Sequence, residues 1–81
     1  MKVNILGEHK CEIELNEDYY LQSYKSIVGN KGWGKITLYP KWNYSRTTVK
    51  HVSQWLGIPA KEIHKRIKEG SITVSNTEPE I

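Results

Sequence analysis

The chain has 81 residues, 37% of them hydrophobic and 26% charged, with a formal net charge of +3. A chain of this length buries only about 60% of the surface that its unfolded form exposes, which argues against a two-domain enzyme with an enclosed active site. Its one cysteine, Cys11, cannot form a disulfide within the chain, and no apolar run resembles a membrane span or a signal peptide. We therefore expect a soluble, cytoplasmic protein.

The positive charge lies in the second half of the chain. Residues 1–40 contain five basic and five acidic side chains, whereas residues 41–70 contain seven basic side chains against two acidic ones, a balance of +5. This distribution is typical of a nucleic-acid contact, and it also suits an acidic protein partner.

Alternating apolar and polar residues predict strands in the first half of the chain. Residues 3–5 and 11–15 both alternate with a period of two, which indicates a hairpin. The polar run 16–18 interrupts the pattern, and a second strand pair is expected at 24–28 and 35–39.

The segment between this second pair of strands resembles a phosphate-binding loop. Gly29 and Gly34 have the spacing of that motif and Lys35 follows them, but Ile36 stands where the motif has a Ser or Thr. A strand also follows, where the motif requires the start of a helix. We therefore expect a hairpin tip, with Trp33 either exposed or folded back.

Two short helices joined by a tight turn are expected next. Ser45 is placed to cap the first helix, with Tyr44 and Val49 as a hydrophobic staple across its start, and Gly57 ends it. The apolar positions of the first helix recur at helical spacing: Val49, Val52 and Leu56.

The second helix has equally clear boundaries. Pro59 suits its first turn, and Gly70 ends it. Its apolar stripe is Ala60, Ile63 and Ile67. Residues 72–74 alternate as a last short strand, and residues 75–81 carry no pattern and form a flexible tail.

These elements predict an α+β domain over residues 1–74. We expect an antiparallel sheet of about four strands, then the two helices in a helix-turn-helix-like unit, then the short C-terminal strand. We expect Trp42 and Tyr44 to belong to a small aromatic core.

The second helix presents lysines opposite its apolar stripe. Lys61, Lys65 and Lys68 share that side. They could contact phosphates. The alternative is a solvated face, because Glu62 and Arg66, like Lys65 and Glu69, have the i,i+4 spacing of ion pairs within a helix.

Residues 48–58, followed by Ile63, Ile67 and residues 70–72, resemble the helix-turn-helix of excisionase-like and mercury-resistance-type regulators, in which a small winged domain reads DNA. Ser53 stands where that family prefers Ala. The second helix departs from the family, which opens it with a Ser or Thr cap and an Arg-rich face, whereas this chain has residues 59–62, Pro-Ala-Lys-Glu.

A second resemblance is to small proteins of bacteriophages and prophages, which have a short sheet followed by a Tyr-Ser-x-Thr-Thr-x-Lys-His element. The matching residues here are Tyr44, Ser45, Thr47, Thr48, Lys50 and His51. This resemblance implies a phage-type accessory protein in the host cytoplasm, and it implies no mechanism.

No pattern in the chain indicates catalysis, a cofactor or a metal site. The histidines and Cys11 lack the spacing of zinc ligands, and no Ser, His and acid arrangement or paired carboxylates indicate an active site. We therefore expect a binding protein and no enzyme.

The leading hypothesis is a DNA-binding helix-turn-helix regulator whose second helix enters the major groove of double-stranded DNA. The alternative is a phage-encoded inhibitor of a host protein, such as a CRISPR-type defence nuclease, and a structural subunit of a virion stays open, as does the oligomeric state. The expected binding residues, for either DNA or a protein partner, are Arg46, Lys50, His51, Lys61, Lys65, Lys68 and Trp33.

Overall fold

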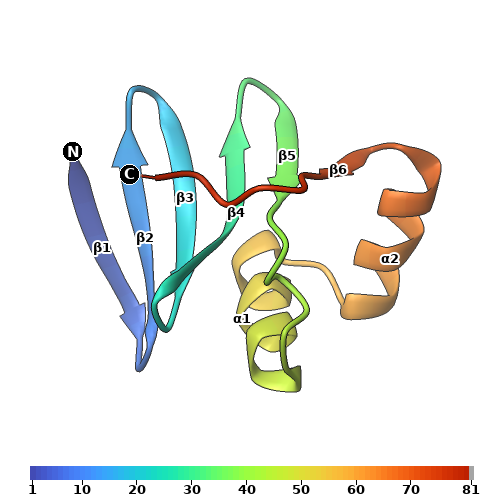
Figure 1. Ribbon diagram of the computed structural model, residues 1–81, viewed down its shortest axis with the longest axis horizontal. Coiled ribbons are helices and arrows are strands. Elements are labelled where there is room, and N and C mark those ends of the chain that lie inside the picture. The colour runs from blue at the N-terminus through green and yellow to red at the C-terminus, as the bar shows by residue number, and fades with distance from the viewer. Residues whose placement is uncertain (81) are drawn as a thin grey trace.

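The computed structural model describes residues 1–80, which form a six-stranded sheet and two helices (Figure 1). The strands are β1 (Lys2–Gly7), β2 (Lys10–Leu15), β3 (Asp18–Ser23), β4 (Ser26–Gly32), β5 (Lys35–Leu38) and β6 (Ile72–Val74). The helices, α1 (Arg46–Leu56) and α2 (Ala60–Glu69), lie between β5 and β6 in the chain. The expected α+β class is confirmed.

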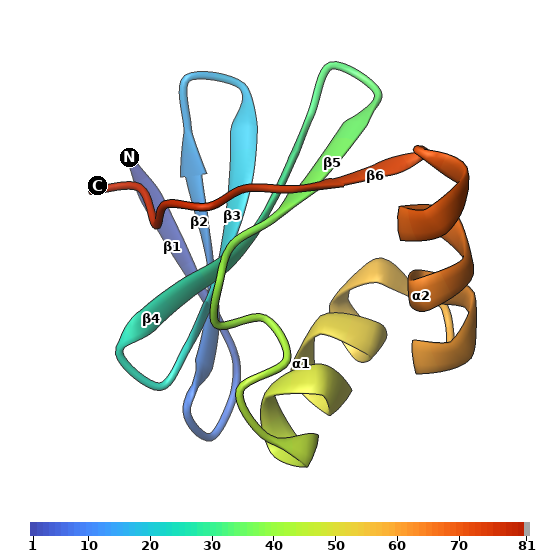
Figure 2. The ribbon, with the colours of Figure 1, turned by 45° about the vertical axis from the view of Figure 1, so that its right-hand side comes forward.

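The order of strands in the sheet follows the order in the chain. The first five strands pair antiparallel with their neighbours, as short hairpin turns require. β6 pairs parallel with β5, with Ile36 opposite Ile72, because the two helices form the crossover between them. The amide of Ser75 donates to the carbonyl of Leu38 at 2.8 Å, and residues 76–80 then run back past β4 and β3 in both views (Figures 1 and 2).

The sequence pattern did not reveal β3, so the expectation of about four antiparallel strands was too low. Leu21 and Ser23 stand two residues apart in β3, and both are buried. An inward-facing position of this kind usually carries an apolar side chain. A serine is tolerated at position 23 because its hydroxyl is hydrogen-bonded to His51 of α1. A buried polar residue of this kind obscures the alternation that marks a strand.

The hairpin of β4 and β5 is also longer than expected. Only Trp33 and Gly34 separate the two strands, so most of the predicted loop 29–34 is strand. A Cβ atom at Gly29 would lie 2.9 Å from Cζ3 of Trp55. Gly29 therefore permits the close approach of α1 to the sheet, which is a known reason for glycine inside a strand.

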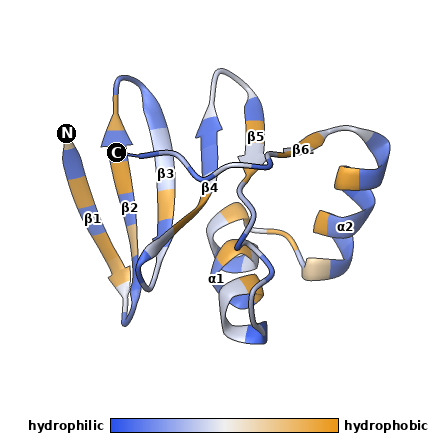
Figure 3. Cartoon of the chain, viewed as in Figure 1, coloured by the Kyte–Doolittle hydropathy of each residue, from blue (hydrophilic) through white to orange (hydrophobic). Residues whose placement is uncertain are grey.

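The core lies between the sheet and the two helices. Its buried members are Leu21, Val28, Leu38, Trp42, Val52, Ile63 and Ile72. Figure 3 shows the apolar positions of α2 on the side turned toward α1, in agreement with the predicted stripe. Within the described residues, neither helix has the length and apolar content needed to cross a membrane.

The predicted helix ends are largely confirmed. The Ser45 side chain accepts from the amide of Thr48, and Gly57 and Gly70 end the helices in the left-handed conformation. Pro59 occupies the cap position of α2 instead of its first turn. The predicted core position of Tyr44 is wrong: its side chain is 80% exposed, which leaves little buried area for the expected staple.

Candidate functional site

A three-residue turn, Gly57 to Pro59, fixes α2 relative to α1. The carbonyl of Ser53 accepts from the amides of Gly57 and Ile58, at 2.9 and 3.2 Å. The Ser53 hydroxyl in turn donates to the carbonyl of Ile58 at 2.5 Å. Ser53 therefore bonds to Gly57 and to both backbone groups of Ile58, which fixes the start of the turn that leads into α2.

The outer side of α2 is basic, as the sequence predicts. Lys61, Lys65 and Lys68 are all exposed. Arg66 differs from them, because its Nε lies 3.3 Å from Oε1 of Glu62 in an ion pair within the helix. The exposed His64 lies over Trp42, with the ring centroids 5.3 Å apart. Three lysines thus remain available to a partner on this side.

The structure does not gather the other predicted residues at α2. Arg46 and Lys50 are exposed on α1, one turn apart. Trp33 is 80% exposed at the tip of the β4–β5 hairpin. His51 is only 8% exposed, so it contributes to packing more than to a surface.

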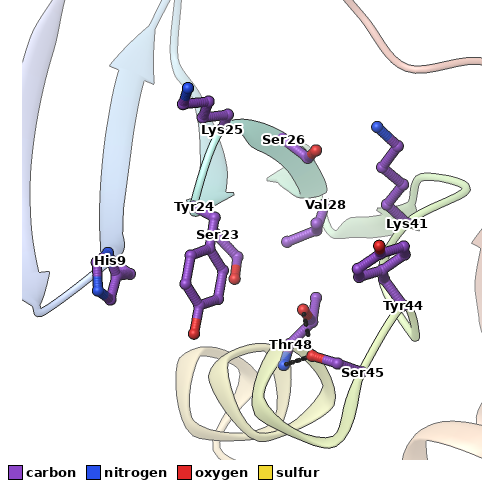
Figure 4. Close-up of a pocket in the computed structure, with 10 residues that line it drawn as sticks. All are labelled: His9, Ser23, Tyr24, Lys25, Ser26, Val28, Lys41, Tyr44, Ser45 and Thr48. Atoms are coloured by element: carbon purple, nitrogen blue, oxygen red, sulfur yellow. Dashed lines mark hydrogen bonds between the residues drawn. The ribbon is translucent and has the colours of Figure 1, made fainter.

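A groove at the start of α1 was missed by sequence reasoning (Figure 4). It has a volume of about 760 Å³. It is lined by the turns after β1 and β3, by β4 and by the segment 41–48, specifically His9, Ser23, Tyr24, Lys25, Ser26, Val28, Lys41, Tyr44, Ser45 and Thr48. We call it the α1 groove. Its residues come from distant parts of the chain, so no local signal could group them.

The Tyr-Ser-x-Thr-Thr-x-Lys-His element of residues 44–51 contributes one wall of the α1 groove. Tyr44, Ser45 and Thr48 line it, and His51 lies behind it, bonded to Ser23. In Figure 4, Tyr24 and Tyr44 stand on opposite sides of the groove, with Val28 between them and the capping pair Ser45 and Thr48 at one end.

Two of the residues that line the α1 groove, on its Tyr24 side, have strained backbones. His9 and Tyr24 have positive φ angles of 62° and 57°, a conformation that costs energy for non-glycine residues. Their rings are stacked at 4.7 Å and 15°, and the Tyr24 amide donates to the His9 carbonyl at 2.7 Å. These contacts fasten the β1–β2 turn to the β3–β4 turn and fix the Tyr24 ring.

The α1 groove carries positive charge. Lys25 and Lys41 line it, and no Asp or Glu is among its lining residues. The first turn of α1 also contains no acidic residue. Among the described residues, we therefore find an environment that suits an anionic group.

Ser23 and His51 have the spacing of a nucleophile and its base, with Oγ and Nδ1 2.7 Å apart. Ser23 is only 2% exposed, and among the described residues no carboxylate is bonded to His51 to orient it. Burial, then Lys10, His9 and Lys50, lower the pKa of His51 and so favour its neutral form. The pair suits a structural hydrogen bond. Within residues 1–80 no group of three potential ligands could hold a metal ion.

A family model described as a family of unknown function, DUF8033, matches residues 1–73. The chain belongs to this family. The match includes both helices and all strands except the last residue of β6, and it therefore covers every residue that lines the α1 groove. No curated protein and no solved structure matched the chain.

Proposed function

We propose that this protein acts by binding double-stranded DNA through α2, as a small regulator of the phage type. The observation that carries the proposal is the exposed lysine row of α2, which has no acidic partner within ion-pair distance in the described residues. Its members are Lys61, Lys65 and Lys68.

The position of α2 supports this function. Its apolar side, anchored by the fully buried Ile63, packs inward, so the lysine row faces away from the core. The turn held by Ser53 joins it rigidly to α1. A helix of 10 residues, about 15 Å long, fits the major groove of DNA.

Different basic residues would serve different contacts. Lys61 and Lys65 lie in the first two turns of α2, the part that enters the groove in helix-turn-helix proteins. Arg46 and Lys50 of α1, with Lys68, would contact flanking phosphates.

A salt titration of duplex binding tests the proposal. We expect binding at low salt that weakens steeply as salt rises, and the double variant Lys61→Ala/Lys65→Ala should reduce the slope of log K against log salt by about two. The matched control is Lys2→Ala/Lys35→Ala, which removes the same charge from exposed positions on β1 and β5. No duplex binding at low salt, or an equal loss in both variants, would contradict the proposal.

One observation favours a second candidate function, inhibition of a host protein such as a CRISPR-type defence nuclease. Trp33 is 80% exposed and has a φ of 54°, so a large apolar ring is held in water in a strained conformation. Tryptophans of this kind anchor protein interfaces.

A pull-down from host lysate separates the two functions. A stoichiometric protein partner that survives nuclease treatment, is released by Trp33→Ala and is kept by Lys61→Ala/Lys65→Ala would favour the inhibitor. A partner lost on nuclease treatment would favour DNA binding.

A further inference from the structure

We infer that the α1 groove binds a nucleotide unit, with its base against Tyr24 and Tyr44 and its phosphate near Lys25 and Lys41. This site is separate from the α2 lysine row and goes beyond duplex binding. The sequence predicted the hairpin that contains the β1–β2 turn, but it gave no signal for the β3–β4 turn or for the meeting of the two turns at one groove.

The size and lining of the groove suit a planar ligand. A volume of about 760 Å³ lies within the range of small-molecule sites. Its two tyrosines, Tyr24 and Tyr44, are 47% and 80% exposed and stand on either side of the buried Val28 (Figure 4). Aromatic rings around an apolar floor are the surfaces on which unpaired bases stack.

The charges suit a phosphate. Lys25 and Lys41 are both exposed and lie at the end of the groove opposite Ser45 and Thr48 (Figure 4). No acidic side chain lines the groove to neutralise them. An anion with an apolar, planar body complements this arrangement better than a purely hydrophobic ligand, which would leave both lysines without a partner.

The Tyr24 wall is built before any ligand arrives. Its ring is stacked on His9 at 4.7 Å and lies 5.9 Å from the ring of His51. Its left-handed backbone is held by the bond from its amide to the His9 carbonyl. A ring held in place loses little freedom when a base stacks on it, which favours binding.

Two probes test whether the groove binds a free nucleotide or a nucleotide within a single strand. A fluorescein-labelled single-stranded oligothymidylate reports binding by anisotropy, and a mononucleotide, AMP, reports binding by calorimetry. Binding of both indicates a site for single nucleotides. Binding of the oligonucleotide alone indicates a single-strand site. Binding of neither at low salt overturns the inference.

Matched variants test the role of the groove. Tyr44→Ala should weaken oligonucleotide binding by about five- to a hundred-fold, the effect of losing one stacked base. Tyr19→Ala removes another tyrosine, 39% exposed on β3 and outside the α1 groove, and should change little. Equal losses in the two variants would contradict the inference. Circular dichroism melting checks that both remain folded.

Two further comparisons distinguish binding in the α1 groove from binding by α2 and from non-specific attraction between charges. Lys61→Ala/Lys65→Ala should keep oligonucleotide binding, while Tyr44→Ala should keep duplex binding, so either proposal can fail alone. An abasic oligonucleotide of equal charge should bind at least ten-fold more weakly than oligothymidylate. Equal binding would show that the tyrosines do not stack on bases.

Discussion

Ser23 of β3 and His51 of α1 are joined by a buried hydrogen bond, with Oγ and Nδ1 2.7 Å apart. The two residues are 2% and 8% exposed, and they connect the first helix to the middle of the sheet. The bond satisfies both polar groups in a place where an unpaired one would cost about 1–3 kcal/mol. It explains why a serine and a histidine can occupy these two buried positions.

The stability of the protein should fall as the pH is lowered through the range in which histidine titrates. Burial lowers the pKa of His51 in the folded state, so the unfolded chain takes up a proton near pH 6.5 and the folded chain does not. Stability is therefore greatest above that pH and decreases from about pH 7.5 toward pH 5. Urea unfolding at a series of pH values measures this decrease.

His51→Asn is the control for this dependence. Asparagine keeps a polar group near the position of Nδ1 and does not titrate, so the slope between pH 7.5 and 5 should become shallower than in the original protein. If the two slopes are the same, another group is responsible for the pH dependence.

Gly29→Ala should destabilise the fold by about 1–3 kcal/mol, because the added methyl group meets the Trp55 ring in a packed region. Its Cβ would lie 2.9 Å from Cζ3 of Trp55 and 3.4 Å from Cδ2 of Leu38. The measurement is the midpoint of urea unfolding. The cost of Gly29→Ala should be smaller in a Trp55→Leu background than in the original protein, and full additivity of the two changes would show that this contact is not the cause.

Trp33→Asn should stabilise the β4–β5 hairpin by about 1 kcal/mol, the usual cost of a left-handed conformation for such a residue. Trp33 and Gly34 both have positive φ angles, at 54° and 73°, and Asn-Gly is the preferred pair for such a two-residue turn. Thermal melting measures the change. A lower melting temperature would mean that the exposed ring contributes to the fold.

Ser45→Ala should cost about 1 kcal/mol, because Ser45 is the cap of α1. Its Oγ accepts from the Thr48 amide at 3.2 Å. The exposed neighbour Thr47 provides the control, since Thr47→Ala removes a hydroxyl from the same turn and should change stability by less than about 0.5 kcal/mol. If both variants lose similar stability, the loss at Ser45 does not come from its capping hydrogen bond.

The helices could be predicted from sequence because their signals are local. Ser45, Gly57 and Gly70 act within one turn of their own helix, and Ile63 and Ile67 repeat at helical spacing. The lysine row of α2 follows from the same periodicity. Each of these features depends on residues a few positions apart, so a short stretch of sequence is sufficient to predict it.

The sheet was only partly predictable because strand pairing joins residues that are far apart in the chain. β3 was hidden by its buried serine, and Gly29 was interpreted as a loop residue because the Trp55 ring that requires it lies in another element. Tyr44 follows an apolar pattern in the sequence, yet the fold leaves it exposed beside the α1 groove.

The sequence by itself determined the two helices, their boundaries, the positive charge of the second half and the α+β class. Only the tertiary structure decided the parallel pairing of β6 with β5 and the burial of His51 against Ser23. It also placed the β3–β4 turn beside the start of α1, and the α1 groove lies between them. The physical reason is that capping and helical periodicity act over a few residues, whereas burial, stacking and cavities depend on how distant segments pack.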